Sequence, residues 1–147
     1  MALFSAFDIS ASGLTAQRLR TDTIAQNLAN ANTTRTSNGG PYVRKTVVFA
    51  EKRSSAFKDV LMTTAGHVGN GVKAIKVVKD TSTAMHIVYD PGHPDADENG
   101  YVTYPNVNTV TEMTNLIDAS RSYEANVTAF QASKAMALKG LEISSTS

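Results

Sequence analysis

Apolar and small side chains recur at alternating steps of three and four residues in the C-terminal part of the chain, which predicts one long amphipathic helix over 109–143. Thr109 and Glu112 form a capping-box pattern for its start. The predicted seam has the rhythm of a coiled coil and consists of Met113, Leu116, Ser120, Tyr123, Val127, Phe130, Lys134, Ala137 and Leu141. Such a helix is roughly 50 Å long. The rest of the chain is too short to cover it, so it needs partner helices.

The N-terminal part repeats this rhythm more weakly and predicts a second helix over 5–31. Leu14, Ile24 and Leu28 lie on its seam, but so do polar residues. Because its apolar area is too small for folding alone, this helix needs either the C-terminal helix or a neighbouring subunit. Two terminal helices of similar rhythm predict an antiparallel, coiled-coil-like pair.

Three asparagines and a threonine follow one another closely at the end of the first predicted helix: Asn27, Asn30, Asn32 and Thr33. Asparagine tolerates the left-handed conformation that ends helices, and its amide caps backbone groups. The cluster is therefore interpreted either as a helix C-terminus that runs into a turn or as a site of specific recognition.

Between the helices the period changes to two, which indicates strands over 42–49, 72–79, 85–89 and 101–105. Asn99-Gly100 is typical of a hairpin turn, three glycines make 66–71 a loop, and 57–62 is too short and mixed to assign. The predicted fold is mainly α with a small β insert. Its domains are the paired terminal helices, 1–35 with 107–147, and a loop-rich β unit over 36–106.

The residues Asp95, Asp97 and Asn99 match the opening of a calcium-binding EF-hand loop. The twelfth position of that loop, where a bidentate Glu is needed, is Asn106. A charged turn and a calcium-binding interaction module are therefore the two alternatives for this segment.

Composition narrows the possible functions. The chain has 147 residues, enough for one domain, with 14 basic and 13 acidic residues spread along it, and this distribution predicts no nucleic-acid partner. It has no cysteine, no apolar run of membrane length and no Sec-type signal pattern at its start. Nucleophile, phosphate-loop and metalloprotease motifs are absent from the sequence. We therefore expect a soluble, non-enzymatic protein without a cofactor or a small-molecule substrate.

Several separated blocks resemble one known family. The segment 27–33 resembles the N-terminal signature of bacterial flagellar rod, hook and related axial proteins. Tyr42 after Gly39-Gly40-Pro41 and the segments 89–91, 97–108, 112–113 and 120–126 resemble the proximal rod proteins of the flagellar basal body. One departure is Thr34-Arg35, where many axial relatives continue with Pro-Gly.

The resemblance implies a structural subunit of the proximal rod that is exported by the flagellar type III apparatus without a cleaved signal peptide. It implies helical assembly in the periplasm and transmission of torque from the motor to the hook. The implied partners are other proximal and distal rod proteins, further copies of this chain, and MS-ring and export-gate components at the rod base. The helix contacts expected in such an assembly are Leu14, Ile24, Leu28, Met113, Leu116, Tyr123, Val127, Phe130 and Leu141. Asn27, Asn30, Asn32 and Thr33 are expected to fix the helix end.

Overall fold

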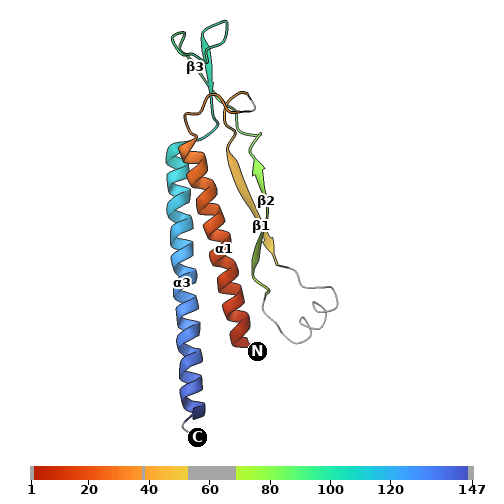
Figure 1. The fold of residues 1–147 in the computed structure, drawn as a ribbon, viewed down its shortest axis with the longest axis vertical. Coiled ribbons are helices and arrows are strands. Elements are labelled where there is room, and N and C mark those ends of the chain that lie inside the picture. Colours follow the sequence, from red (N-terminus) through yellow and green to blue (C-terminus); the bar gives the residue numbers. More distant parts are fainter. Residues whose placement is uncertain (1, 38, 53–68, 146–147) are drawn as a thin grey trace. The chain divides into compact units, whose positions relative to one another are not determined.

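A helix stands at each end of the chain, with short strands between the two helices (Figure 1). The computed structural model describes residues 2–37, 39–52 and 69–145. Helix α1 is Ala2–Ala29 and helix α3 is Thr109–Ser145. The predictions of a mainly helical chain, of both terminal helices and of a small β region between them are confirmed.

Four strands form two separate two-stranded sheets. Strand β1, Lys45–Glu51, pairs with β2, Val72–Lys79. Strand β3, His86–Tyr89, pairs antiparallel with β4, Tyr101–Tyr104, so that Tyr89 lies opposite Tyr101. All four predicted strands are present, but β1 begins three residues later than the pattern predicted. The segment 57–62 and residues 66–68 of the predicted loop lie outside the described residues.

The Asn99-Gly100 signal ends the connection between β3 and β4, as predicted. The Gly100 N–H donates to the Asp97 carbonyl and the Asp97 N–H to the Tyr101 carbonyl, at 3.0 and 2.9 Å. Gly100 has a φ of 80°, a left-handed conformation that glycine adopts without steric cost. Asn99-Gly100 therefore closes a local turn at the end of the 90–100 connection and is not the two-residue loop of a tight hairpin.

The described residues form two compact units: those within 1–19, 49–75 and 119–147 make one, and those within 20–48 and 76–118 make the other. The predicted division into a helical domain and a β insert groups these segments differently and stays a prediction. In the unit that contains both termini, the rings of Phe7 and Phe130 meet edge to face with centroids 5.0 Å apart. Segments of α1 and α3 therefore contact each other there.

Gly13 marks a second close approach of α1 and α3 in the same unit. A Cβ atom at this position would lie 2.7 Å from the Asn126 Oδ1 atom, closer than carbon and oxygen can pack. The Asn126 amide also donates to the Ser122 carbonyl at 2.8 Å. Glycine is otherwise unfavourable inside a helix, and a larger residue at this position would require the Asn126 amide to move.

The buried face of α3 is displaced by one residue from the predicted seam over most of its length. Most of its buried and half-buried residues are small or polar, namely Glu112, Asn115, Ala119, Ser122, Asn126, Ser133 and Ala137, and the large apolar residues Leu116, Val127 and Phe130 are half-buried beside them. Met113 and Leu141, on the predicted seam, are 53% and 67% exposed. Of the predicted seam, Leu116, Val127, Phe130 and Ala137 are half-buried, whereas the other five residues are exposed, because the chain also packs small and polar side chains that allow close approach.

The predicted capping box at the start of α3 is wrong. Asn108 caps the helix: its side-chain oxygen accepts from the Thr111 N–H at 3.1 Å, and its carbonyl accepts from the Glu112 N–H at 2.9 Å. Asparagine is among the best N-cap residues. The Glu112 carboxylate therefore does not cap the helix and accepts hydrogen bonds from other donors.

Candidate functional site

Asn27 is the centre of a buried polar cluster, which we define as Asn27, Tyr42, Arg44, Asn106 and Glu112. The Asn27 residue is 1% exposed. Its Nδ2 donates to the Lys45 carbonyl and to the Glu112 carboxylate, at 2.8 and 2.9 Å. Its Oδ1 accepts from the Tyr42 hydroxyl and the Lys45 N–H, both at 2.9 Å. The amide thus uses its full hydrogen-bonding capacity to hold the first residue of β1.

Glu112 supplies the negative charge of the polar cluster, at the first turn of α3. The residue is fully buried, and its Oε1 accepts from the Arg44 Nε and Nη2 at 2.9 and 2.8 Å. A guanidinium that offers two N–H groups to one carboxylate fixes both position and orientation. A buried carboxylate is tolerated only when it is paired in this way.

Asn106 and Asp80 extend this network to the end of β2. The Asn106 Oδ1 accepts from the Arg44 N–H at 2.9 Å, and its Nδ2 donates to the Asp80 carbonyl at 2.7 Å. The Asp80 carboxylate accepts from Ser82, Thr83 and, at 3.4 Å, the Arg44 Nη1. The Ser82 and Thr83 donors, with Ser82 first, hold the pKa of Asp80 well below its ordinary value.

Burial and the neighbouring Glu112 charge raise the pKa of the Tyr42 hydroxyl, with burial as the larger cause. Both effects disfavour the phenolate. The unfolded chain loses this proton near its ordinary pKa of 10.0, while the folded chain still holds it. The contribution of Tyr42 to the free energy of unfolding is therefore fully present below pH 10 and is lost as the pH rises through the raised pKa.

Tyr42→Phe is expected to remove this pH dependence. Above pH 10 the free energy of unfolding of the unmodified chain should fall more steeply than that of the variant, by up to about 1.4 kcal/mol per pH unit. Below pH 10 the variant should be about 1 kcal/mol less stable because Asn27 loses a donor. Urea unfolding at several pH values measures both effects. Tyr123→Phe, at an exposed tyrosine, is the control, and equal alkaline slopes for Tyr42→Phe and the unmodified chain would contradict this assignment.

The other residues of the Asn-rich signature lie at the end of α1 and in the turn that follows. The Asn30 Nδ2 donates to the Gln26 carbonyl at 2.8 Å, and its Oδ1 accepts from the Thr33 hydroxyl at 3.2 Å. Asn32 is exposed. Among the described residues only glycines have positive φ, so the left-handed conformation expected of asparagine is not adopted here. The turn interpretation describes Asn30 and Thr33, whereas Asn27 has the specific partners of the polar cluster.

Thr34 and Arg35, which depart from the axial pattern, both bind Asp95. The Thr34 hydroxyl and the Arg35 guanidinium each lie 2.7 Å from an oxygen of its carboxylate. The Asp97 carboxylate accepts from the N–H groups of Asn99 and Tyr101. The segment predicted as either a charged turn or a calcium loop is therefore a turn whose carboxylates bind protein donors. Within the part of the chain that is described, no group of three His, Cys, Asp or Glu residues could hold a metal ion.

The expected helix contacts divide into two groups. Ile24 is buried at 6% exposure, and Leu14, Leu28, Leu116, Val127 and Phe130 are half-buried. Met113, Tyr123 and Leu141 are exposed. Neither helix, over the residues described, combines the length and apolar character needed to cross a membrane. The role of these residues in contacts between subunits stays a prediction.

Sequence reasoning missed Arg44 as a functional residue and assigned Glu112 to a helix cap. Their pairing joins positions 68 residues apart, which no local pattern can reveal. A signal was nevertheless available, because Asn27, Tyr42, Asn106 and Glu112 all lie in the blocks that carry the family resemblance. The polar cluster connects those separated blocks.

The chain matches two family models and is similar to several known proteins. Residues 7–35 match the flagella basal body rod protein model, and residues 98–143 match the flagellar basal body rod FlgEFG protein C-terminal model. The flagellar basal-body rod protein FlgC of Bacillus subtilis is 48% identical over 97% of this chain and 99% of its own length. FlgC proteins of Borreliella burgdorferi and Salmonella typhimurium are 43% and 41% identical, each over 97% of this chain and 98% of their own.

Proposed function

The chain belongs to the FlgC family of flagellar basal-body rod proteins, and we propose that it assembles helically into the proximal rod and transmits torque from the motor to the hook. As a member of that family it is a structural subunit of the basal-body rod. The observation that carries the mechanistic proposal is the large apolar surface of α3. A helical assembly arises when a subunit uses two different surfaces for contacts that do not close into a ring.

The exposed apolar residues of α3 supply one such surface. Eight large apolar side chains of this helix are between 40% and 72% exposed: Val110, Met113, Ile117, Tyr123, Met136, Leu138, Leu141 and Ile143. Large exposed apolar patches mark interaction sites, and a single helix that leaves eight large apolar side chains exposed offers apolar surface to neighbouring subunits. Met113, Tyr123 and Leu141 are the members of the expected interface that are available to a neighbouring subunit.

We also propose that α1 and α3 pair antiparallel as the rod-forming part of the subunit. Phe7 contacts Phe130, and Gly13 lies against Asn126, so residues that come later in α1 meet residues that come earlier in α3. Much of the buried face of α3 is small or polar, so this pairing uses only part of its apolar surface. The large apolar residues are then left for other subunits.

Family membership supports the remaining parts of the proposal. Export by the flagellar type III apparatus, assembly in the periplasm, and contacts with other proximal and distal rod proteins, with further copies of the chain, and with MS-ring and export-gate components are what a proximal rod subunit requires. Asn27, Asn30, Asn32 and Thr33 would fix the end of α1 in such an assembly, through the hydrogen bonds of Asn27 and Asn30.

The test is Leu141→Asp, at a side chain that is 67% exposed. A charge in a dry contact between subunits costs several kcal/mol, so a strain carrying only this variant should not swim and should yield no rods. The thermal midpoint of the purified chain should be unchanged. Gln131→Asp, at an exposed polar position of the same helix, is the matched control. Normal swimming and normal rods with Leu141→Asp would contradict the proposed role of this surface.

A further inference from the structure

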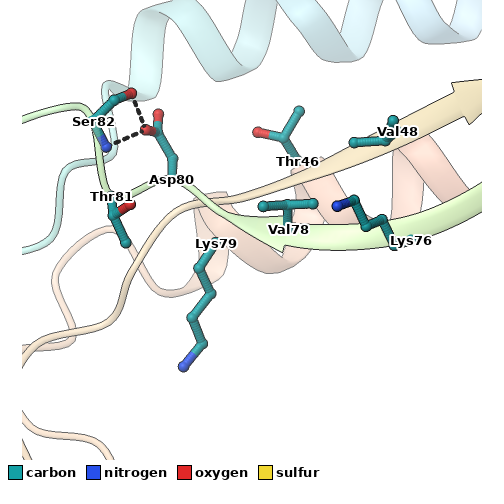
Figure 2. Close-up of a pocket in the computed structure, with 8 residues that line it drawn as sticks. All are labelled: Thr46, Val48, Lys76, Val78, Lys79, Asp80, Thr81 and Ser82. Carbon is teal, nitrogen blue, oxygen red and sulfur yellow. Dashed lines mark hydrogen bonds between the residues drawn. The ribbon is translucent and has the colours of Figure 1, made fainter.

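An open hollow of about 630 Å³ lies against the end of β2. We call it the β2 hollow, and its lining is Thr46, Val48, Lys76, Val78, Lys79, Asp80, Thr81 and Ser82. Val48 and Val78 are 37% and 36% exposed, so part of its wall consists of exposed apolar side chains. Figure 2 shows the Lys79 side chain pointing away from Thr46 and Val48. Side chains two apart in a strand share a face, so Lys76 lies on the face of Val78.

The β2 hollow offers a positive charge to an occupant. Strand β2 contains three lysines and no acidic residue, and Lys76 is exposed. The acidic residue of the lining, Asp80, already accepts from Ser82, Thr83 and Arg44. An occupant that complements the β2 hollow therefore carries a negatively charged group next to an apolar side chain.

The hairpin of β3 and β4 has this character. From His86 to Tyr104 the sequence holds four acidic residues, Asp90, Asp95, Asp97 and Glu98, and no Lys or Arg. Asp95 is paired with Arg35, whereas Asp90, Asp97 and Glu98 are exposed. Tyr89 and Tyr101 lie opposite each other, 64% and 46% exposed, with ring centroids 5.3 Å apart. The hairpin thus presents an exposed aromatic pair beside three exposed carboxylates, which form no salt bridge with the residues that the structure describes.

We propose that the acidic hairpin of one copy of this chain docks into the β2 hollow of a second copy. The Glu98 carboxylate pairs with the Lys76 ammonium, and the tyrosine pair covers Val48 and Val78. An exposed ion pair alone contributes little, so the apolar contact supplies affinity and the charges supply orientation. Since the two surfaces differ, the contact can pass from copy to copy. The inference rests on the proposed function and specifies one contact of the subunit with itself.

Charge reversal tests the pairing. Sedimentation of the purified full chain at low salt measures self-association. Lys76→Glu and Glu98→Lys should each weaken it about tenfold, because an attraction becomes a repulsion, and the double variant should return to within about threefold of the unmodified chain. Added salt should weaken association of the unmodified chain. Lys73→Glu, on the other face of β2, and Asp118→Lys, exposed on α3, are the controls and should have no effect.

A second measurement uses the absence of cysteine from the chain. Thr81→Cys lines the hollow and Asn99→Cys lies in the hairpin turn. A mixture of the two single variants should form a disulfide-linked heterodimer under mild oxidation, faster than either variant alone. Absence of self-association, equal effects of Lys73→Glu and Lys76→Glu, no recovery in the double variant, or no heterodimer would each overturn the docking proposal. The rod function is judged separately, by whether Leu141→Asp abolishes swimming.

Discussion

Arg44→Met is expected to lower the free energy of unfolding by about 3 kcal/mol, because it leaves the buried Glu112 carboxylate without its cationic partner. This cost is at the lower end of the range for breaking a buried ion pair, because the Arg44 side chain is 24% exposed. For a chain of this length the loss corresponds to a fall of roughly 6–12 °C in the thermal midpoint. Thermal unfolding followed by circular dichroism measures it.

The double variant Arg44→Met with Glu112→Met tests whether the unpaired charge causes this loss of stability. A buried ion pair replaced by apolar side chains of similar volume is often no less stable than the original, so the double variant should recover most of the lost stability. Arg18→Met, at an exposed arginine of α1, should change the free energy of unfolding by less than about 0.5 kcal/mol. A double variant as unstable as Arg44→Met alone would show that the cost arises from lost packing rather than from an unpaired charge.

The polar cluster explains what local patterns could and could not predict. Both helices and all four strands follow from periodicity, which depends only on neighbours in the sequence. The partners of Asn27 and Glu112 depend on contacts between residues up to 85 positions apart. Asparagine at a helix end is typical of a cap, and the pattern contains nothing to distinguish such a cap from an amide that holds a strand.

The face of α3 shows a different limit of sequence reasoning. Periodicity indicated correctly that this helix has a buried stripe, but the assignment of large apolar residues to it assumed that the chain buries its own hydrophobic surface. In an assembling subunit the largest apolar residues can belong to contacts with other chains. Gly13 and Asn126 lie at a close approach of α1 and α3, whereas Met113 and Leu141 remain exposed.

Phe130→Asp separates contacts within the chain from contacts between subunits. Phe130 meets Phe7 inside the chain, so the substitution removes an aromatic contact and places a charge against the Phe7 ring. We expect a loss of about 3 kcal/mol or more in the free energy of unfolding and, as a consequence, no swimming. Leu141→Asp should abolish swimming while leaving the thermal midpoint unchanged. Phe130→Leu is the conservative control, with an expected cost below about 1.5 kcal/mol. If Phe130→Asp kept the thermal midpoint of the unmodified chain and still abolished assembly, Phe130 would belong to the surface between subunits, and the Phe7 contact would contribute little to folding.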